Sequence, residues 1–483
     1  MVMKILTIIL MGFVVTFCSP EQTLLETIKA QGELVVVTRA GPTTYYIGLE
    51  GEALGLEYEL TQRFASQLGV NLKLIVATHY ADILPMVVKQ QVHFAAAGLT
   101  VNRERRELVR FSPAYQKTTH QLVYRKSMPN IPRSLADLNE TTPLVLINGS
   151  SQVDLCKRLQ QEYPQLTWQT VDLSPMEVLE KINTEEIKFA LLHTNEIMQM
   201  QRFFPELQVS FEVADDELVA WAFPRTIGDD SLYVEAMRFL NQLRTSGELD
   251  RLIDRYYGHI DFAEFDYVDT RTFYRHVQER LPFYRKHFEQ VGLLYNLDWR
   301  LLAAMGYQES HWNPDAVSYT GVRGIMMLTH ATALELNIQD REDSIQSIDG
   351  AARYFLMLRD KLNENIPEPD KTFFTLAAYN VGLGHLYDAQ QLARQQGLDP
   401  YRWVEVKKML PLLSDPKWYR RTRHGYARGS EPVYFVNNVR RFYDKLLASL
   451  DVPVDADKQE IRIFSPQQQP TQYLSKPSQL PVL

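Results

Sequence analysis

The residue with the most distinctive chemical setting is Glu309, in the segment from Asp298 to Pro314. Asp298 is a typical first residue of a helix, and Pro314 marks its end. At helical spacing, Leu302, Met305 and Glu309 fall on one otherwise apolar face. A carboxyl group there loses hydration and faces the negative end of the helix dipole, so we expect a raised pKa. A carboxyl that stays protonated near neutral pH is what glycosidic cleavage requires, although an isolated Glu at a helix end is usually exposed.

Three later segments carry side chains suited to holding a sugar polymer. Residues 321–329 contain glycines that let a loop approach a polymer closely, followed by a Thr that can cap a helix. Tyr379 and Asn380 stand at the end of a helical pattern with glycines behind them, where they can bind hydroxyl and N-acetyl groups. Tyr434 stands near the start of the last helical pattern. One such motif alone is weak evidence for a site that binds a sugar polymer, whereas the three motifs in this order are strong evidence.

In this order the segments resemble the lytic transglycosylases of the lysozyme-like superfamily, over residues 285–445. The resemblance implies that Glu309 protonates the glycosidic oxygen between N-acetylmuramic acid and N-acetylglucosamine, then acts as base on the muramyl C6 hydroxyl. That hydroxyl closes on C1 and leaves a 1,6-anhydromuramyl end, without a second catalytic carboxylate. Met327 departs from the family, in which Gln usually stands. The implied substrate-binding residues are Ser310, Met327, Tyr379, Asn380, Glu431 and Tyr434.

Two alternatives from other classes stay open on the sequence. A hydrolytic muramidase would use the same Glu309 acid but activate water instead of the C6 hydroxyl, and the chemical form of the product distinguishes the two. A non-catalytic, peptidoglycan-tethered solute-binding receptor is the other alternative. The presence of Glu309, Asn380 and Tyr434 argues against it.

The first half of the chain has a different pattern. Short β-branched runs at residues 34–37, 72–76 and 144–147 alternate with helical patterns such as 56–68. This alternation predicts an α/β domain with largely parallel strands. Several runs end in small or hydroxyl residues, and ligands of open α/β sheets bind at such strand ends.

The segments 98–105 and 111–115 resemble family 3 solute-binding proteins, and the resemblance covers residues 31–258. It implies that Arg105 grips a ligand carboxylate, with the Thr100 hydroxyl beside it and an aromatic ring from Tyr45 or Tyr46 over the ligand. The acidic residue that would receive an amino acid's ammonium is not found at residues 193–195, which read His-Thr-Asn. We therefore expect a muropeptide or stem-peptide carboxylate rather than a free amino acid.

The first residues indicate the compartment. Residues 1–18 carry one cation, Lys4, and then an apolar run too short to span a bilayer, which is typical of an export signal. Cys18 resembles the lipidated cysteine of bacterial lipoproteins, but Phe17 stands where a small residue is usual. Cleavage just after Cys18 and retention of the segment as a short anchor are the alternatives. We expect an exported protein at the periplasmic face of the outer membrane, either peripheral or lipid-anchored.

Composition limits the remaining function classes. The 483 residues carry a formal charge of −8, with a pI of about 5.8, so the chain has no overall positive charge to attract nucleic acid, and no nucleic-acid partner is expected. The chain has two cysteines, and His/Cys spacing indicates no metal site and no cofactor. The partners expected are peptidoglycan glycan strands, a muropeptide or stem peptide, and the outer-membrane surface.

The fold class predicted is an α/β, two-lobed, periplasmic-binding-protein-like domain followed by a mainly α, lysozyme-like domain. The expected organisation is a signal segment at 1–18, a solute-binding domain at 31–258, a linker with a first helix at 259–284, a catalytic domain at 285–450 and a flexible, Pro/Gln-rich tail at 451–483.

Overall fold

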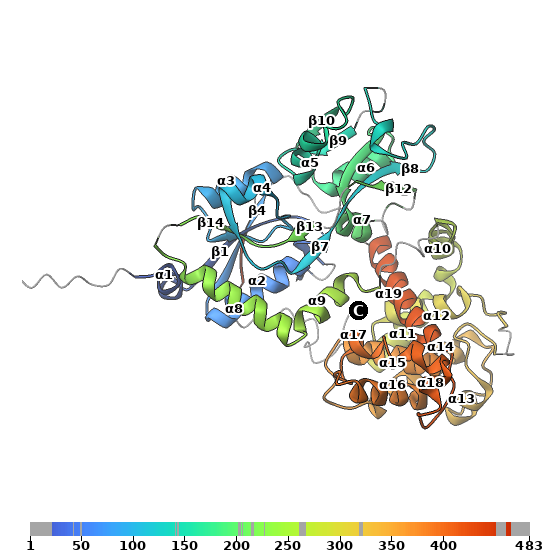
Figure 1. Cartoon of the computed structure of the whole chain (residues 1–483). Coiled ribbons are helices and arrows are strands. Elements are labelled where there is room, and N and C mark those ends of the chain that lie inside the picture. The colour runs from blue at the N-terminus through green and yellow to red at the C-terminus, as the bar shows by residue number, and fades with distance from the viewer. Residues whose placement is uncertain are drawn as a thin grey trace, which may run out of the picture.

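The computed structural model shows an α/β half of two lobes and a helical half (Figure 1). It describes residues 22–41, 43–48, 51–140, 142, 144–200, 204, 206–213, 217–226, 228–259, 267–317, 322–450 and 460–464. The expected signal segment, including Cys18, lies outside the described residues. This architecture confirms the predicted fold class.

The first lobe is built on a six-stranded sheet in the order β15-β4-β1-β5-β14-β6. The central strand β1 runs parallel to β4 and β5, and its buried β-branched side chains contribute to the core between sheet and helices. The strands are β1 (Glu33–Arg39), β4 (Asn71–Ala77), β5 (Phe94–Ala95), β6 (Val109–Phe111), β14 (Ala222–Pro224) and β15 (Glu460–Phe464), with a separate pair of β2 (Tyr46–Ile47) and β3 (Ala53–Leu54). The helices are α1 (Leu24–Gln31), α2 (Leu56–Leu68), η1 (Tyr80–Asp82), α3 (Ile83–Val88), α4 (Arg103–Leu108), α8 (Ser231–Thr245) and α9 (Glu248–Tyr257).

The second lobe has a five-stranded sheet in the order β10-β9-β11-β8-β12. Its strands are β8 (His120–Arg125), β9 (Leu144–Ile147), β10 (Trp168–Val171), β11 (Phe189–His193) and β12 (Leu207–Glu212). Its helices are η2 (Leu135–Asp137), α5 (Ser151–Leu159), α6 (Pro175–Asn183) and α7 (Thr194–Met200). The chain crosses between the lobes along β7 (Gln116–Thr118) and β13 (Glu217–Val219), which pair antiparallel. These two strands form the hinge of the domain.

The helical half is organised around α12 (Trp299–Ser310), whose residues 301–307 are all buried. Asp298 caps the helix as predicted, since its side chain accepts from the Arg300 N–H at 2.8 Å. Helix α19 (Ser430–Leu450) packs against both α12 and α15 (Asp370–Val381). The other helices are α10 (Tyr267–Glu279), α11 (Leu281–Tyr295), α13 (His330–Glu335), α14 (Ser344–Lys361), α16 (Leu383–Gln395), α17 (Trp403–Val406), η3 (Leu410–Ser414) and α18 (Pro416–Tyr419).

Charged side chains join the two halves along α9. Asp254 is buried and forms ion pairs with Lys407 and with Arg440, whose Nη1 lies 3.6 Å from Asp254 Oδ2. Arg251 Nε lies 3.4 Å from Asp370 Oδ2 at the start of α15. Because breaking a buried pair leaves an uncompensated charge, these contacts tie the α/β half firmly to the helical half.

Part of the tail differs from the expected flexible extension. Residues 460–464 form β15, which pairs antiparallel with β4 at the edge of the first-lobe sheet. Strand pairing satisfies backbone groups whatever the side chains, so a Pro/Gln-rich composition did not reveal it. No helix among the described residues is long and apolar enough to cross a membrane.

Candidate functional site

Glu309 lies in the last turn of α12, with its side chain partly exposed at the surface. Desolvation by the surrounding protein raises its pKa from 4.5 to about 8. The carboxyl group is therefore mostly protonated at neutral pH, and its partial exposure leaves it accessible. This is the combination that a proton donor to an oxygen in a glycan strand needs.

Tyr379, at the end of α15, lies close enough to Glu309 for the charge of that carboxyl to affect its phenol. Burial, and then the charge of Glu309, raise the pKa of the Tyr379 phenol well above its usual value. Its hydroxyl donates to the Met326 carbonyl at 3.0 Å, and its ring lies parallel to that of Phe435, with centroids 6.2 Å apart. Tyr379 thus connects three elements around Glu309: α15, the loop before α13, and α19.

Ser310 contacts protein groups on both sides of the site. Its hydroxyl lies 2.7 Å from the Ile325 carbonyl and 3.1 Å from the Gly306 carbonyl, and it accepts from the Asn313 N–H at 3.2 Å. These contacts hold the loop at residues 322–328 against the end of the helix that carries Glu309. The resemblance predicts that Ser310 binds substrate, and in the structure its hydroxyl helps to hold that loop in position.

The loop itself depends on a glycine. Gly324 has a φ of +89°, and a Cβ there would lie 2.2 Å from the Arg341 carbonyl oxygen, so a side chain fits neither the backbone conformation nor the space. Met327 is half-buried and also has a positive φ, +47°. Gly321, the first glycine of the sequence motif, lies outside the described residues.

The remaining expected substrate-binding residues, Asn380, Tyr434 and Glu431, are exposed near the ends of α15 and α19. Asn380 is exposed near the end of α15. Tyr434 is exposed in the first turns of α19, one residue before Phe435, which packs on Tyr379. Glu431 is exposed as well, and its carboxylate lies 3.2 Å from Arg428. Asn380 and Tyr434 are therefore available to a glycan, whereas Glu431 already has a cationic partner.

The cleft between the two lobes contains Arg105, which is buried on α4. Its Nη1 donates to the Thr100 carbonyl at 3.3 Å, and its Nη2 donates across the cleft to the Gly149 carbonyl at 3.0 Å. A Cβ on Gly149 would lie only 2.7 Å from the Cα of Ala81, so the lobes touch at this point. The structure therefore shows the cleft closed. The Arg105 guanidinium, which the resemblance predicts to bind a ligand carboxylate, instead donates to two backbone carbonyls.

The other expected ligand-binding residues all belong to the first lobe. Thr100 is fully buried. Tyr45 is buried with its ring edge-on to Tyr58, centroids 6.0 Å apart, and Tyr46 is half-buried in β2. The sequence analysis missed Tyr80, whose ring lies 5.8 Å from the Arg105 guanidinium.

An ion pair between the lobes was also missed. Arg39, at the end of β1, pairs with Glu196 on α7, and both side chains are buried. Burial disfavours the Glu196 carboxylate, but the adjacent Arg39 charge outweighs this and lowers the pKa of Glu196 to about 2. An acidic residue therefore does follow the strand at 189–193, one position beyond the residues inspected. Because Arg39 already neutralises the charge of Glu196, this carboxylate is not free to receive the ammonium group of an amino acid.

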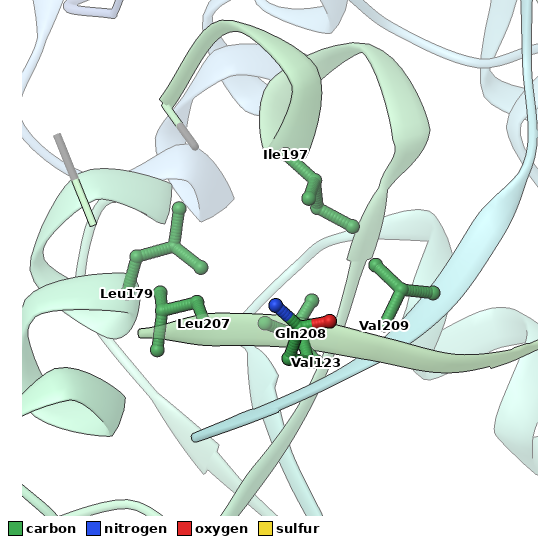
Figure 2. Close-up of a pocket in the computed structure, with 6 residues that line it drawn as sticks. All are labelled: Val123, Leu179, Ile197, Leu207, Gln208 and Val209. Carbon is green, nitrogen blue, oxygen red and sulfur yellow. The ribbon is translucent and has the colours of Figure 1, made fainter. Parts of the chain in front are cut away.

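An apolar crevice inside the second lobe is not part of either site (Figure 2). The apolar side chains that line it are those of Val123, Leu179, Ile197, Leu207 and Val209. They belong to the hydrophobic core between the sheet and helices α6 and α7. None of the expected ligand-binding residues lines it, so it is a packing feature.

Family models match both halves of the chain. Residues 34–259 match the bacterial extracellular solute-binding proteins, family 3, and residues 286–401 match the transglycosylase SLT domain. The chain is 47% identical over 428 residues to the membrane-bound lytic murein transglycosylase F 1 of Alkalilimnicola ehrlichii, covering 88% of this chain and 85% of that one. It is 46% identical over 430 residues to the membrane-bound lytic murein transglycosylase F of Ectopseudomonas mendocina, covering 88% and 87%. A solved ancestral arginine-binding protein bound to arginine is 20% identical and covers 47% of this chain and 98% of that chain, with a TM-score of 0.43.

The fold, the setting of Glu309 and these matches define a class of enzyme in which a solute-binding domain precedes a transglycosylase domain. The chain belongs to the membrane-bound lytic murein transglycosylase F family. The alignment with these relatives extends over both domains, so the relatives share the whole two-domain chain and not one half alone.

Proposed function

We propose that Glu309 is the catalytic acid and base of the lytic murein transglycosylase activity of this chain, whose substrate is the peptidoglycan glycan strand. The observation that carries the assignment is a partly exposed carboxyl at the end of α12 with a pKa of about 8. Glu309 gives its proton to the glycosidic oxygen as the bond from that oxygen to C1 of N-acetylmuramic acid breaks. The carboxylate then removes the proton from the C6 hydroxyl, whose oxygen bonds to C1 and forms the 1,6-anhydro ring.

This sequence of steps needs one carboxyl group, because the substrate supplies the nucleophile. The first proton leaves with the departing sugar as its hydroxyl proton, and the proton taken from the C6 hydroxyl replaces it on Glu309, so the enzyme ends as it began. Among the expected substrate-binding residues, Asn380 and Tyr434 are exposed and suited to sugar hydroxyls, and Met327 can pack against a sugar face. Tyr379, Ser310 and Glu431, also expected to bind substrate, contact protein groups as well.

Mass spectrometry of digested peptidoglycan tests the assignment. The chain without its signal segment should release products with anhydro ends, one water lighter than reducing ends. Glu309→Gln should release none, whereas the matched control Glu335→Gln, an exposed carboxyl on α13, should behave as wild type. Products with reducing ends would indicate a hydrolytic muramidase, and undiminished activity of Glu309→Gln would exclude the mechanism.

We further propose that the first domain binds a carboxylate-bearing cell-wall peptide or muropeptide through Arg105 and Thr100, with Tyr45 or Tyr46 against the ligand, and that binding alters the cleavage rate. Opening the lobes would free the Arg105 guanidinium from the Gly149 carbonyl for a ligand carboxylate. A ligand changes the rate only if it binds the active and less active arrangements with different affinity.

Calorimetric titration with a stem peptide tests this proposal. Arg105→Ala should abolish binding, and Arg103→Ala, an exposed arginine on the same helix, should not. Binding without any change in cleavage rate would exclude regulation while leaving the ligand site intact.

The relatives are named as membrane-bound, and we propose that this chain is also held at a membrane, at the periplasmic face of the outer membrane, by acylation of Cys18. Cell fractionation of the full chain and of Cys18→Ala tests the anchor. Release of the variant into the soluble periplasmic fraction is expected. Equal membrane association of both proteins would mean that another part of the chain binds the membrane.

A further inference from the structure

Three side chains that are far apart in the sequence meet at the hinge of the first domain. His120 is the first residue of β8, and His193 is the last residue of β11, directly opposite it in the antiparallel register. Glu217 is the first residue of the hinge strand β13. One ligand-type atom from each of the three lies within 4.8 Å of the other two.

Both histidines are buried, Glu217 is partly exposed, and the hydrogen bonding of the cluster is incomplete. His120 is 0% exposed, and neither of its ring nitrogens has a hydrogen-bond partner. Its Nε2 lies 3.0 Å from Glu217 Oε2, but the contact is not aligned as a hydrogen bond, and Glu217 Oε2 also has no hydrogen-bond partner. Buried polar atoms without partners are unfavourable, so these atoms are candidates for binding a ligand.

His193 is oriented by groups behind it. Its Nε2 lies 3.1 Å from Ser151 Oγ, and its Nδ1 lies 3.6 Å from Glu196 Oε2. Histidines that bind metals commonly keep one ring nitrogen on such an outer partner, which fixes the ring orientation. Either ring nitrogen of His193 can therefore face a ligand while the other retains its neighbour.

The donor atoms of the cluster indicate the class of ion that it would bind. Two imidazoles and a carboxylate form a donor set typical of Zn²⁺ and related ions, whereas Ca²⁺ and Mg²⁺ prefer oxygen ligands only.

We propose that His120, His193 and Glu217 bind one divalent transition-metal ion of the Zn²⁺ class at the hinge between the two lobes. Zn²⁺ bonds of about 2.0–2.2 Å place tetrahedral donors about 3.4 Å apart, so the side chains close on the ion by rotations of their outer atoms. Three protein ligands leave the fourth position for water or for a carboxylate of a bound ligand. This site is independent of the transglycosylase chemistry at Glu309.

Metal titration of the chain without its signal segment, stripped with a chelator, tests the proposal. Co²⁺ is the probe, because a tetrahedral site with nitrogen and oxygen donors gives it a visible absorption band. We expect one Co²⁺ per chain, displaced by one Zn²⁺. His120→Gln, His193→Gln and Glu217→Gln should each weaken binding by more than the roughly 10–100-fold that loss of an outer partner causes.

The controls separate this site from other binding. His79→Gln changes an exposed histidine of the first lobe and should bind Co²⁺ as wild type does. Ser151→Ala keeps all three ligands but removes the outer partner of His193, and should weaken binding about tenfold. Circular dichroism in the presence of chelator identifies any ligand variant that fails to fold. If a ligand variant does not fold, the weaker Co²⁺ binding expected of Ser151→Ala becomes the test of the proposal. Absence of Co²⁺ binding, or binding that none of these substitutions weakens, would overturn the proposal.

Discussion

Glu309→Gln should make the protein more stable at high pH while abolishing its activity. The reason is that the folded chain resists ionising this carboxyl, whose pKa is raised from 4.5 to about 8. Below pH 4.5 the group is protonated in both the folded and the unfolded chain, so the charge has no effect on stability. Between pH 4.5 and about 8 the folded chain holds the proton more tightly, and the wild-type protein loses stability as the pH rises.

The size of the effect follows from the pKa. Each unit between the folded and unfolded values corresponds to about 1.4 kcal/mol, so a pKa of about 8 sets an upper limit of about 5 kcal/mol above that pH. Because Glu309 is partly exposed, water screens the charge and we expect about 2 kcal/mol. For a helical domain of this size, that raises the midpoint of thermal unfolding by about 4–8 °C.

Thermal unfolding at pH 4.5, 7 and 9, followed by circular dichroism, measures the effect. The difference between Glu309→Gln and wild type should be near zero at pH 4.5 and should grow to its full value at pH 9. Glu335→Gln, which changes an exposed carboxyl, should show no such pH dependence. A stability difference that stays constant from pH 4.5 to 9, or a variant less stable than wild type at pH 9, would refute the assignment of a desolvated Glu309.

Three further substitutions test contacts that position the sites. Glu196→Gln leaves Arg39 buried without its counter-charge, so chemical denaturation should show the first domain destabilised by about 3–5 kcal/mol; an unchanged midpoint would mean that the pair is dispensable. Asp254→Asn removes the partner of Arg440 at the junction of the halves, with an expected loss of similar size, and limited proteolysis should cut between the halves faster than in wild type. Gly324→Ala places a Cβ against a backbone carbonyl at a φ of +89°, and should lower stability by more than about 1 kcal/mol together with turnover; normal turnover would show that the loop shape does not matter for catalysis.

Much of the catalytic half could be predicted from local sequence signals. The cap at Asp298 and the apolar spacing of Leu302 and Met305 predict a helix with Glu309 on its inner face, and the structure has that helix at Trp299–Ser310. Capping and periodicity act within a few residues, so a single sequence reveals them. The alternation of short strands and helices predicted the two-lobed α/β domain for the same reason.

Other features depend on residues brought together from distant segments. Ser310 carries no local sign that its hydroxyl meets the Ile325 carbonyl, and Arg39 none that it pairs with Glu196. The strand at 460–464 was hidden in a Pro/Gln-rich tail because its pairing with β4 uses backbone groups. Such contacts form only when distant segments pack together, and their strength depends on how deeply the groups are buried, so the spacing of residues in the sequence does not reveal them.

The sequence by itself therefore determined the order of the two domains, the helix that carries Glu309 and the type of chemistry that a carboxyl there can perform. The tertiary structure decided how far the pKa of Glu309 rises, because desolvation depends on which elements pack around it. It also decided that the lobes meet over Arg105, and that His120, His193 and Glu217 lie close together at the hinge. Distances between segments far apart in the chain exist only after the sheets and helices have packed.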